Sequence, residues 1–124
     1  MLGIVACMAD ALEIVGRYKE AFGSGDVQTA RSLLADDFHF EGPFETFDNP
    51  DDYLQSLARL APIVEGVDVK KVLTDGDDVV TIYDLRTNTV GTSPVAEWAT
   101  VRNGKIAELR AYFDARPFAA MFEG

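Results

Sequence analysis

Apolar residues recur at helical spacing near the start of the chain. Over residues 9–22 they fall on one face, three and four positions apart, at Ala11, Leu12, Val15, Tyr18 and Phe22. The pattern predicts a buried amphipathic helix, which the sequence GSGD ends at residues 23–26. Asp26 is placed to cap a short second helix over residues 27–35. That helix should turn inward Ala30, Leu33 and Leu34.

A third helix is expected to begin in the sequence DNPDD. Asn49 is a suitable N-cap, Pro50 fits the first helical position, and the two aspartates that follow complement the positive end of the helix dipole. Pro62 ends this helix. Its inward positions are Tyr53, Leu54, Leu57 and Leu60.

Between the second and third helices, the sequence DDFHFE alternates apolar and polar residues, which is the period of a β-strand. Phe38 and Phe40 share one face, while His39 and Glu41 share the other. Gly42 and the following proline terminate the strand. We expect His39 to be a surface or interface residue, because nothing supplies a nucleophile or a metal ion beside it.

Four further strands follow, over residues 67–73, 79–87 and 95–101 and from Lys105 onward. The expected turns between them are DGDD, GTSP and RNGK, of which the last carries the Asn-Gly pair typical of a two-residue hairpin. Helices come first and an antiparallel meander follows, so the fold class is α+β. We expect a cone-shaped, curved, mostly antiparallel (mixed) sheet wrapped around three helices, with one internal pocket.

Composition narrows the class of protein. A chain of 124 residues with 48% hydrophobic and 26% charged content fits one globular domain. Its net charge of -10 opposes nucleic acids and anionic membranes as partners. The opening MLGIVACMADAL lacks a basic leader and a long apolar core, so we expect a cytoplasmic protein. Met8 could be the native start, and residues 1–8 are treated as a candidate extension of the domain. The lone Cys7 and the lone histidine offer no metal cluster, and no cofactor is expected.

Carboxylates occur on strand faces that are otherwise apolar. Glu97 shares its face with Val95, Ala99 and Val101, so burial would raise the pKa of its carboxyl and suit it to proton transfer. The alternatives are a bulge that turns Glu97 to solvent, or a partner across a dimer interface. Asp84 also lies on a largely apolar face, where a salt bridge with Arg86 is the simpler explanation.

The pattern leaves the role or the orientation of two more residues open. The Tyr18 hydroxyl, on the buried helix face, must find a partner and could donate to a ligand oxygen or to a carboxylate; a core tyrosine is the alternative. Asp114 ends the last strand, where alternation places it opposite the apolar face of Ala107, Leu109, Ala111 and Phe113. Strand ends often twist or bulge, so its orientation stays open.

The order of elements, with the segments GRYKEAFGSGDVQTARSLLADDFHFEGPF and VRNGKIAELRAYFDARPF, resembles the nuclear-transport-factor-two-like superfamily, in particular its SnoaL-like and ketosteroid-isomerase-like branch. The resemblance covers residues 9–122. It implies that Tyr18 and Glu97 match the hydrogen-bond donors that ketosteroid isomerases direct at the developing oxyanion, a role for which such enzymes keep a carboxylic acid neutral. The proton-shuttling aspartate of those isomerases falls on Gly42, so that mechanism is not expected.

A second branch offers different roles. Asp114 resembles the terminal-strand aspartate of limonene-epoxide-hydrolase-like and SnoaL-like proteins, where it is a general acid or base. Asp84 approximates the second aspartate of the hydrolases, but the arginine that they place two residues before it is Ile82 here. SnoaL-like polyketide cyclases need chiefly one acid or base and a shaped apolar pocket.

We therefore expect a pocket lined by Tyr18, Phe38, Phe40, Tyr53, Leu57, Glu97 and Phe113, with Asp84 as a further ligand-binding candidate. One hypothesis is a cofactor-independent enzyme of isomerase, cyclase or hydrolase type, with Asp114 as acid or base and Glu97 and Tyr18 polarising the oxygen of a small apolar ligand. The other is a non-catalytic ligand-binding or dimerisation domain. The resemblance implies a homodimer through the outer sheet face, where Trp98 would lie. If Glu97 and Asp114 both prove solvent-facing or salt-bridged, the enzyme hypothesis fails.

Overall fold

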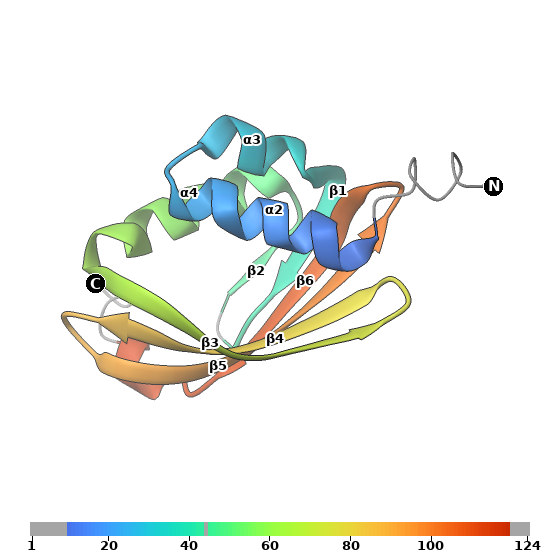
Figure 1. The fold of residues 1–124 in the computed structure, drawn as a ribbon. Coiled ribbons are helices and arrows are strands. Elements are labelled where there is room, and N and C mark those ends of the chain that lie inside the picture. The colour runs from blue at the N-terminus through green and yellow to red at the C-terminus, as the bar shows by residue number, and fades with distance from the viewer. Residues whose placement is uncertain (1–9, 44, 120–124) are drawn as a thin grey trace.

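In the computed structural model, the described residues, 10–43 and 45–119, form three α-helices and six strands (Figure 1). The helices are α2 (Ala11–Gly23), α3 (Val27–Ser32) and α4 (Pro50–Leu60). The strands are β1 (Leu34–Glu41), β2 (Thr46–Phe47), β3 (Val64–Asp75), β4 (Asp78–Thr87), β5 (Gly91–Arg102) and β6 (Lys105–Phe113). Single 3-10 turns, η1 (Ala61–Ile63) and η2 (Arg116–Phe118), follow α4 and β6. The expectations for residues 1–8, Cys7 included, fall outside the described residues.

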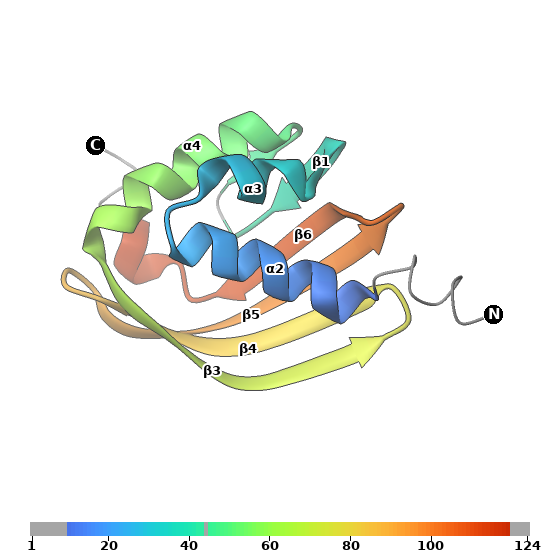
Figure 2. The same ribbon diagram turned by 45° about the horizontal axis from the view of Figure 1, so that its top comes forward.

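All the strands belong to one curved sheet, ordered β2, β1, β6, β5, β4, β3. Neighbouring strands are antiparallel except β1 and β6, which are parallel. The sheet stays open, with β2 and β3 at its edges, and the helices lie against its concave side (Figure 2). The α+β fold class and the mixed, curved sheet around three helices are thus confirmed.

Side-chain caps begin the three helices. The carboxylate of Asp10 accepts from the Glu13 amide at 2.8 Å, Asp26 accepts from Thr29 at 3.1 Å, and Asn49 accepts from Asp52 at 2.9 Å. Each bond satisfies one of the amide groups that the first helical turn leaves unpaired. The predictions for Asp26 and Asn49 are confirmed, as is Pro50 in the first turn of α4.

The boundaries of two predicted helices need correction. The second helix ends at Ser32 rather than at residue 35, because Leu34 begins β1 and pairs with Ile106 of β6. On the first helix, Leu12 is 48% exposed, whereas Ile14 and Ala21 are buried. The helix therefore turns a face to the sheet that is rotated slightly from the predicted one.

Two of the three predicted hairpin turns are present, and each contains a glycine with a positive φ. Gly76 has a φ of 61° between β3 and β4, and Asn103 and Gly104 have φ values of 55° and 75° between β5 and β6. The third prediction was wrong, because GTSP lies inside β5 and the turn precedes it at residues 88–90. Pro94 is tolerated in β5 because β6 ends at Phe113, opposite Val95, and no strand flanks Pro94 on that side.

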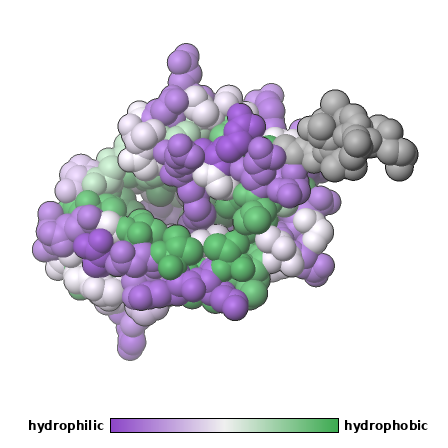
Figure 3. All heavy atoms as spheres, in the orientation of Figure 1, coloured by the Kyte–Doolittle hydropathy of each residue, from purple (hydrophilic) through white to green (hydrophobic). Residues whose placement is uncertain are grey.

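The strand β3 runs from Val64 to Asp75, longer than predicted, and forms an exposed edge. Val67 and Val69 are each about half exposed. Figure 3 shows that hydrophobic residues also border a hollow between the helices and the sheet. The register shifts between Val69 and Lys71, and the lysines at this bulge make the edge a poor template for another strand.

Alternation along β5 and most of β6 gives the predicted faces. Val95, Ala99 and Val101 are buried on the concave side, as are Leu109 and Ala111. The register shift between Thr100 and Val101 pairs Val101 with Ile106, so Ile106 rather than the predicted Ala107 belongs to the core cluster. Trp98 and Tyr112 point the other way and are 36% and 54% exposed. The core lies between these strands and the helices, with Leu34, Phe38 and Ile106 fully buried. Among the described residues, none of the helices is long and apolar enough to span a membrane.

Candidate functional site

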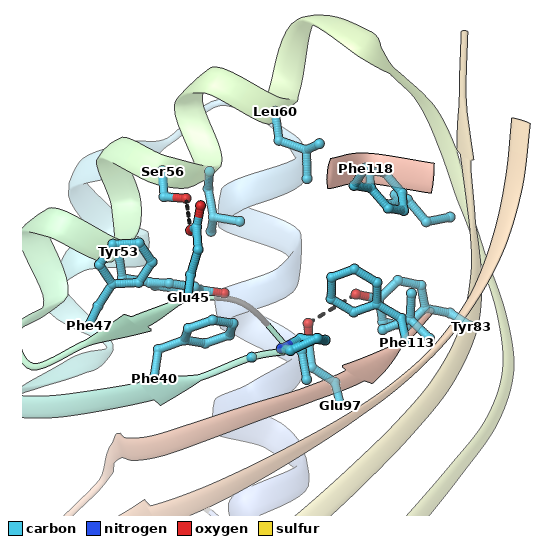
Figure 4. A pocket seen from close by; sticks show the side chains of 16 residues that line it. Phe40, Glu45, Phe47, Tyr53, Ser56, Leu60, Tyr83, Glu97, Phe113 and Phe118 are labelled. Carbon is cyan, nitrogen blue, oxygen red and sulfur yellow. Dashed lines mark hydrogen bonds between the residues drawn. The ribbon is translucent and has the colours of Figure 1, made fainter. Parts of the chain in front are cut away.

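A pocket lies between helix α4 and the concave face of the sheet (Figure 4). About 110 Å³ of its interior is open, several times the roughly 10–15 Å³ that one ordered water requires. The described residues that line it are predominantly apolar. They are Phe40, Gly42, Pro43, Glu45, Phe47, Tyr53, Ser56, Leu57, Leu60, Tyr83, Leu85, Val95, Glu97, Ala111, Phe113 and Phe118.

Strand register decides which sheet side chains reach the pocket. Tyr83 pairs with Val95, and Val95 pairs with Phe113, so the three form one row across β4, β5 and β6. In the next row Glu97 lies between its partners on β4 and β6, one of which is Ala111. Because side chains alternate along each strand, a slip by one residue would turn Tyr83 and Glu97 to the outer face.

Glu97 occupies the sheet side of the pocket and accepts two hydrogen bonds. Lys19 Nζ of helix α2 donates to one carboxylate oxygen at 2.5 Å, and the Tyr83 hydroxyl donates to the other at 3.0 Å. The Glu97 side chain is only 13% exposed, and that of Lys19 is 31% exposed. The ammonium also lies 5.2 Å from the centre of the Tyr83 ring. Glu97 thus acts here as an acceptor in an ion pair, not as the hydrogen-bond donor that the resemblance implied.

Three tyrosines surround this carboxylate. Burial raises the pKa of the Tyr83 hydroxyl far above its usual value, and the negative charge of Glu97 adds to the effect. Burial likewise raises the pKa of Tyr18 and of Tyr53, again with Glu97 contributing. The Tyr18 hydroxyl makes no hydrogen bond of good geometry to any described residue, although its neighbour Tyr53 acts to lower its pKa. All three hydroxyls are therefore protonated at neutral pH.

A second carboxylate lines the pocket from the opposite side. The Ser56 hydroxyl of α4 donates to Glu45 Oε2 at 2.9 Å, and Figure 4 shows the Glu45 side chain rising toward the helix. Ser56 is 9% exposed, so this bond is largely shielded from water. No salt bridge joins Glu45 to a cationic side chain among the described residues.

Gly42, the position at which ketosteroid isomerases keep their aspartate, has little room for a side chain. A Cβ built there would lie 3.0 Å from Cε2 and 3.1 Å from Cζ of the Phe40 ring. The Gly42 amide donates to the Glu45 carbonyl at 2.8 Å, which closes a tight loop beside the pocket. A side chain at this position would require the Phe40 ring to shift by a few tenths of an ångström.

Asp114 is not among the described residues that line the pocket. Its carboxylate accepts from the Arg116 side chain at 2.9 and 2.8 Å and from the Arg116 amide at 3.1 Å, and the side chain is half exposed. These hydrogen bonds hold the pKa of Asp114 at about 2, below its usual value. Its predicted role as a pocket acid or base has no support in this geometry, because Arg116 engages both of its oxygens at the surface.

Asp84 also lies away from the pocket, on the outer face of β4. Its carboxylate is 3.6 Å from Lys70, whereas Arg86 pairs with Asp68 at 2.7 Å. The predicted pairing of Asp84 with Arg86 is therefore wrong, because the neighbouring edge strand supplies a different partner for each. His39, as expected for a surface residue, pairs with Asp48 at 2.9 Å.

Five of the predicted lining residues reach the pocket: Phe40, Tyr53, Leu57, Glu97 and Phe113. Phe38 and Tyr18 are core residues instead, 0% and 5% exposed. Sequence analysis missed Tyr83, Glu45 and Ser56. Tyr83 was missed because its strand neighbour Asp84 was taken to face inward, whereas the structure turns Asp84 outward and Tyr83 toward the pocket. Glu45 and Ser56 gave no signal, since they meet through a loop whose path the pattern does not define.

The described residues contain no group of three or more histidine, cysteine, aspartate or glutamate side chains arranged to hold a metal ion. Around Glu97 the polar neighbours are an ammonium and hydroxyl groups, which leaves the carboxylate without a second acidic or imidazole ligand beside it.

Comparison with known proteins gives the family. The model of the SnoaL-like domain matches residues 15–109, which covers most of the chain. The chain belongs to the SnoaL-like domain family. The match includes the part of α2 that carries Lys19 and the strands that carry Tyr83 and Glu97. No curated protein matches this SnoaL-like chain.

Solved structures agree on the fold. A protein from Kribbella flavida is 29% identical, with a TM-score of 0.81 over 94% of this chain and 99% of its own. An NTF2-like protein of unknown function from Cytophaga hutchinsonii is 25% identical, with a TM-score of 0.77 over 87% and 93%. An epoxide hydrolase from Mycobacterium tuberculosis, described as limonene-epoxide-hydrolase-like, is 24% identical, with a TM-score of 0.71 over 92% and 90%. Together they confirm the NTF2-like superfamily predicted from the sequence.

Proposed function

We propose that this SnoaL-like chain, as one domain, binds a small and mainly apolar molecule in the pocket between α4 and the sheet. One observation carries the proposal: the space stays open although aromatic and aliphatic side chains surround it. A domain that used this fold only as a scaffold would fill such a volume, since empty apolar space costs dispersion contacts. Apolar pockets with a few polar groups are the usual form of small-molecule sites.

Binding is preferred over the two-carboxylate enzyme because of the ion pairs. Asp114 is held by Arg116 at the surface, and Glu97 is held by Lys19. This is the outcome under which the enzyme hypothesis, as built on those two residues, fails. The similarity to an epoxide hydrolase does not support the two-carboxylate enzyme either. Asp84 lies on the outer face, and Ile82 stands where that class of enzyme has an arginine.

A panel of four small aromatic probes tests the binding function: toluene, benzyl alcohol, benzylamine and acetophenone. Amide chemical shifts of the pocket strands are followed by NMR during titration. Ala111→Leu should abolish binding of every probe, because Ala111 lines the pocket. Ala96→Leu is the matched control, since Ala96 lies opposite Tyr112 on the outer face of the neighbouring strand. The proposal fails if none of the probes binds, or if both variants weaken binding equally.

A second candidate function, general-base catalysis by Glu97, is favoured by the position of this carboxylate in the pocket wall. Two of its acceptor positions are taken by Lys19 and Tyr83, which leaves others free for a substrate proton. Ketone and epoxide substrates would be screened with the native chain and with Glu97→Gln. Turnover that persists in Glu97→Gln would rule this role out.

We also propose, as the resemblance implies, a homodimer formed through the outer face of the sheet in a cytoplasmic protein. Ile82 and Tyr112 lie in one row on that face, and Trp98 lies in the next. All three are at least 36% exposed. The Arg110 guanidinium stacks on the Trp98 ring at 3.9 Å, and the Trp98 indole donates to Asp78 at 2.9 Å, so this aromatic group is held in place.

A further inference from the structure

The polar side chains of the pocket present acceptors to whatever enters it. Glu97 accepts from Lys19 and Tyr83, and Glu45 accepts from Ser56. Because the Tyr83 and Ser56 hydroxyls donate their protons to these carboxylates, neither proton is free for a ligand, and each hydroxyl oxygen keeps only its capacity to accept. A ligand carbonyl would have to break one of these charge-assisted bonds to find a donor, whereas a donating ligand finds its partners already arranged.

The two carboxylates differ in how their charge is balanced. Glu97 has Lys19 at 2.5 Å, so a second cation beside it would meet the repulsion of that ammonium. Among the described residues, Glu45 is hydrogen-bonded only by the neutral Ser56 hydroxyl, and Figure 4 shows its side chain rising toward α4, whereas Glu97 lies on the sheet. None of the described lining residues is lysine or arginine. The unbalanced negative charge of the pocket therefore lies at Glu45.

Aromatic rings enclose the space next to Glu45. Phe40 stacks on Tyr53 with ring centres 4.6 Å apart, and Phe47 lies 6.0 Å from Phe40 and 6.2 Å from Tyr53. All three rings line the pocket. The negative face of an aromatic ring attracts an organic cation, and the attraction grows when water is excluded.

We propose that the pocket selects a small aromatic or aliphatic ammonium ion, whose charged nitrogen binds to Glu45 among Phe40, Phe47 and Tyr53 while its apolar part fills the space toward Phe113 and Phe118. This inference rests on the proposed binding function and names its ligand class. It differs from the carbonyl-bearing ligand expected from the sequence, because Glu97 accepts hydrogen bonds and the hydroxyls of Tyr83 and Ser56 already donate to carboxylates. Glu45 and the aromatic group around it are the specificity-determining residues.

The test compares benzylamine, which is protonated at neutral pH, with benzyl alcohol and acetophenone, which match it closely in size. Dissociation constants come from NMR titrations of the native chain at fixed ionic strength. We expect benzylamine to bind at least tenfold more tightly than benzyl alcohol, and acetophenone to bind most weakly. Glu45→Gln should remove the preference for benzylamine, so that benzylamine and benzyl alcohol bind to this variant with dissociation constants within about twofold of each other.

Glu20→Gln is the matched control, because it makes the same change of charge at an exposed position of α2. It should keep the preference, since the general attraction of a chain with net charge -10 for cations does not depend on one surface glutamate. Equal affinities for benzylamine and benzyl alcohol would overturn the inference and leave the binding function standing. A preference that survives in Glu45→Gln would also overturn it. Failure of every probe to bind would contradict the binding function itself, and this inference with it.

Discussion

The ion pair between Lys19 and Glu97 can be tested by removing its cation. Lys19→Met keeps the length of the aliphatic side chain on α2 and leaves a carboxylate that is 13% exposed without its charged partner. At 2.5 Å and an effective dielectric constant of about 20, the gross attraction is about 6–7 kcal/mol. Desolvation of both groups and the ordering of the lysine side chain offset most of it.

The expected net loss lies between the values for surface and buried pairs. Exposed pairs contribute about 0.2–1 kcal/mol, and breaking a buried pair costs about 3–5 kcal/mol. Because Lys19 is 31% exposed, we expect Lys19→Met to lower the free energy of unfolding by about 1–2 kcal/mol. Urea unfolding of Lys19→Met, Glu97→Gln and the double variant forms a cycle, whose coupling should be about 1 kcal/mol.

Lys70→Met provides the matched control on the outer face. Lys70 is 60% exposed and lies 3.6 Å from Asp84, so its removal should change the free energy of unfolding by less than about 0.5 kcal/mol. If Lys19→Met costs no more than Lys70→Met and the cycle shows no coupling, the ion pair does not form in solution. The argument that Glu97 is already neutralised, and that Glu45 carries the unbalanced charge, would then lose its basis.

Three further predictions concern the tyrosines, the surface aspartate and the outer face. Tyr83→Phe should lower the free energy of unfolding by about 1–2 kcal/mol, because it removes a hydrogen bond to a carboxylate. Tyr18→Phe removes no such bond and should change the free energy of unfolding by less than about 0.5 kcal/mol. Urea unfolding that gives the reverse order would contradict the assigned hydrogen bonds. Asp114 should titrate near pH 2 by carboxyl NMR, and Arg116→Ala should return its pKa toward the usual value of about 3.9. Since the folded-state pKa is lowered, the stabilisation from this pair is present above about pH 4 and is lost as the pH falls through about 2. Tyr112→Glu on the outer face should shift the protein toward monomers in sedimentation equilibrium; an unchanged association state would contradict the proposed dimer interface.

Most of the correct predictions about the fold depend on interactions between residues that are close together in the sequence. N-caps and the Asn-Gly turn depend on a few neighbouring residues, so Asp26, Asn49 and Gly104 could be placed from the sequence. The end of the second helix could not, because Leu34 leaves helical structure to pair with Ile106, far along the chain. The GTSP segment misled for a similar reason, since pairing with β4 holds it in a strand despite its turn-forming residues.

The candidate site divides in the same way. Alternation within β5 was enough to place Glu97 on the inner face, because strand parity is a local property. Its partners were not predictable, since Lys19 is 78 positions away and Tyr83 is 14 positions away. The expected proton-transfer role of Glu97 depended on an environment that only these partners define. Asp114 was misplaced by resemblance rather than by pattern, because parity had set it opposite the apolar face.

The direction of the hydrogen bonds has the greatest consequence for ligand chemistry. A carboxylic acid and a phenol that both donate would favour a carbonyl or another oxygen acceptor, as the resemblance to ketosteroid isomerases implied. With Lys19 beside Glu97, the carboxylate accepts and the Tyr83 hydroxyl is turned toward it. Tyr18, the phenol of the resemblance, is buried in the core and is not among the described lining residues. The same pocket shape then favours a donor, and Glu45 adds a charge that no lysine or arginine of the described lining balances. One ion pair between α2 and β5 is therefore enough to change the class of molecule that a pocket of this fold is suited to bind.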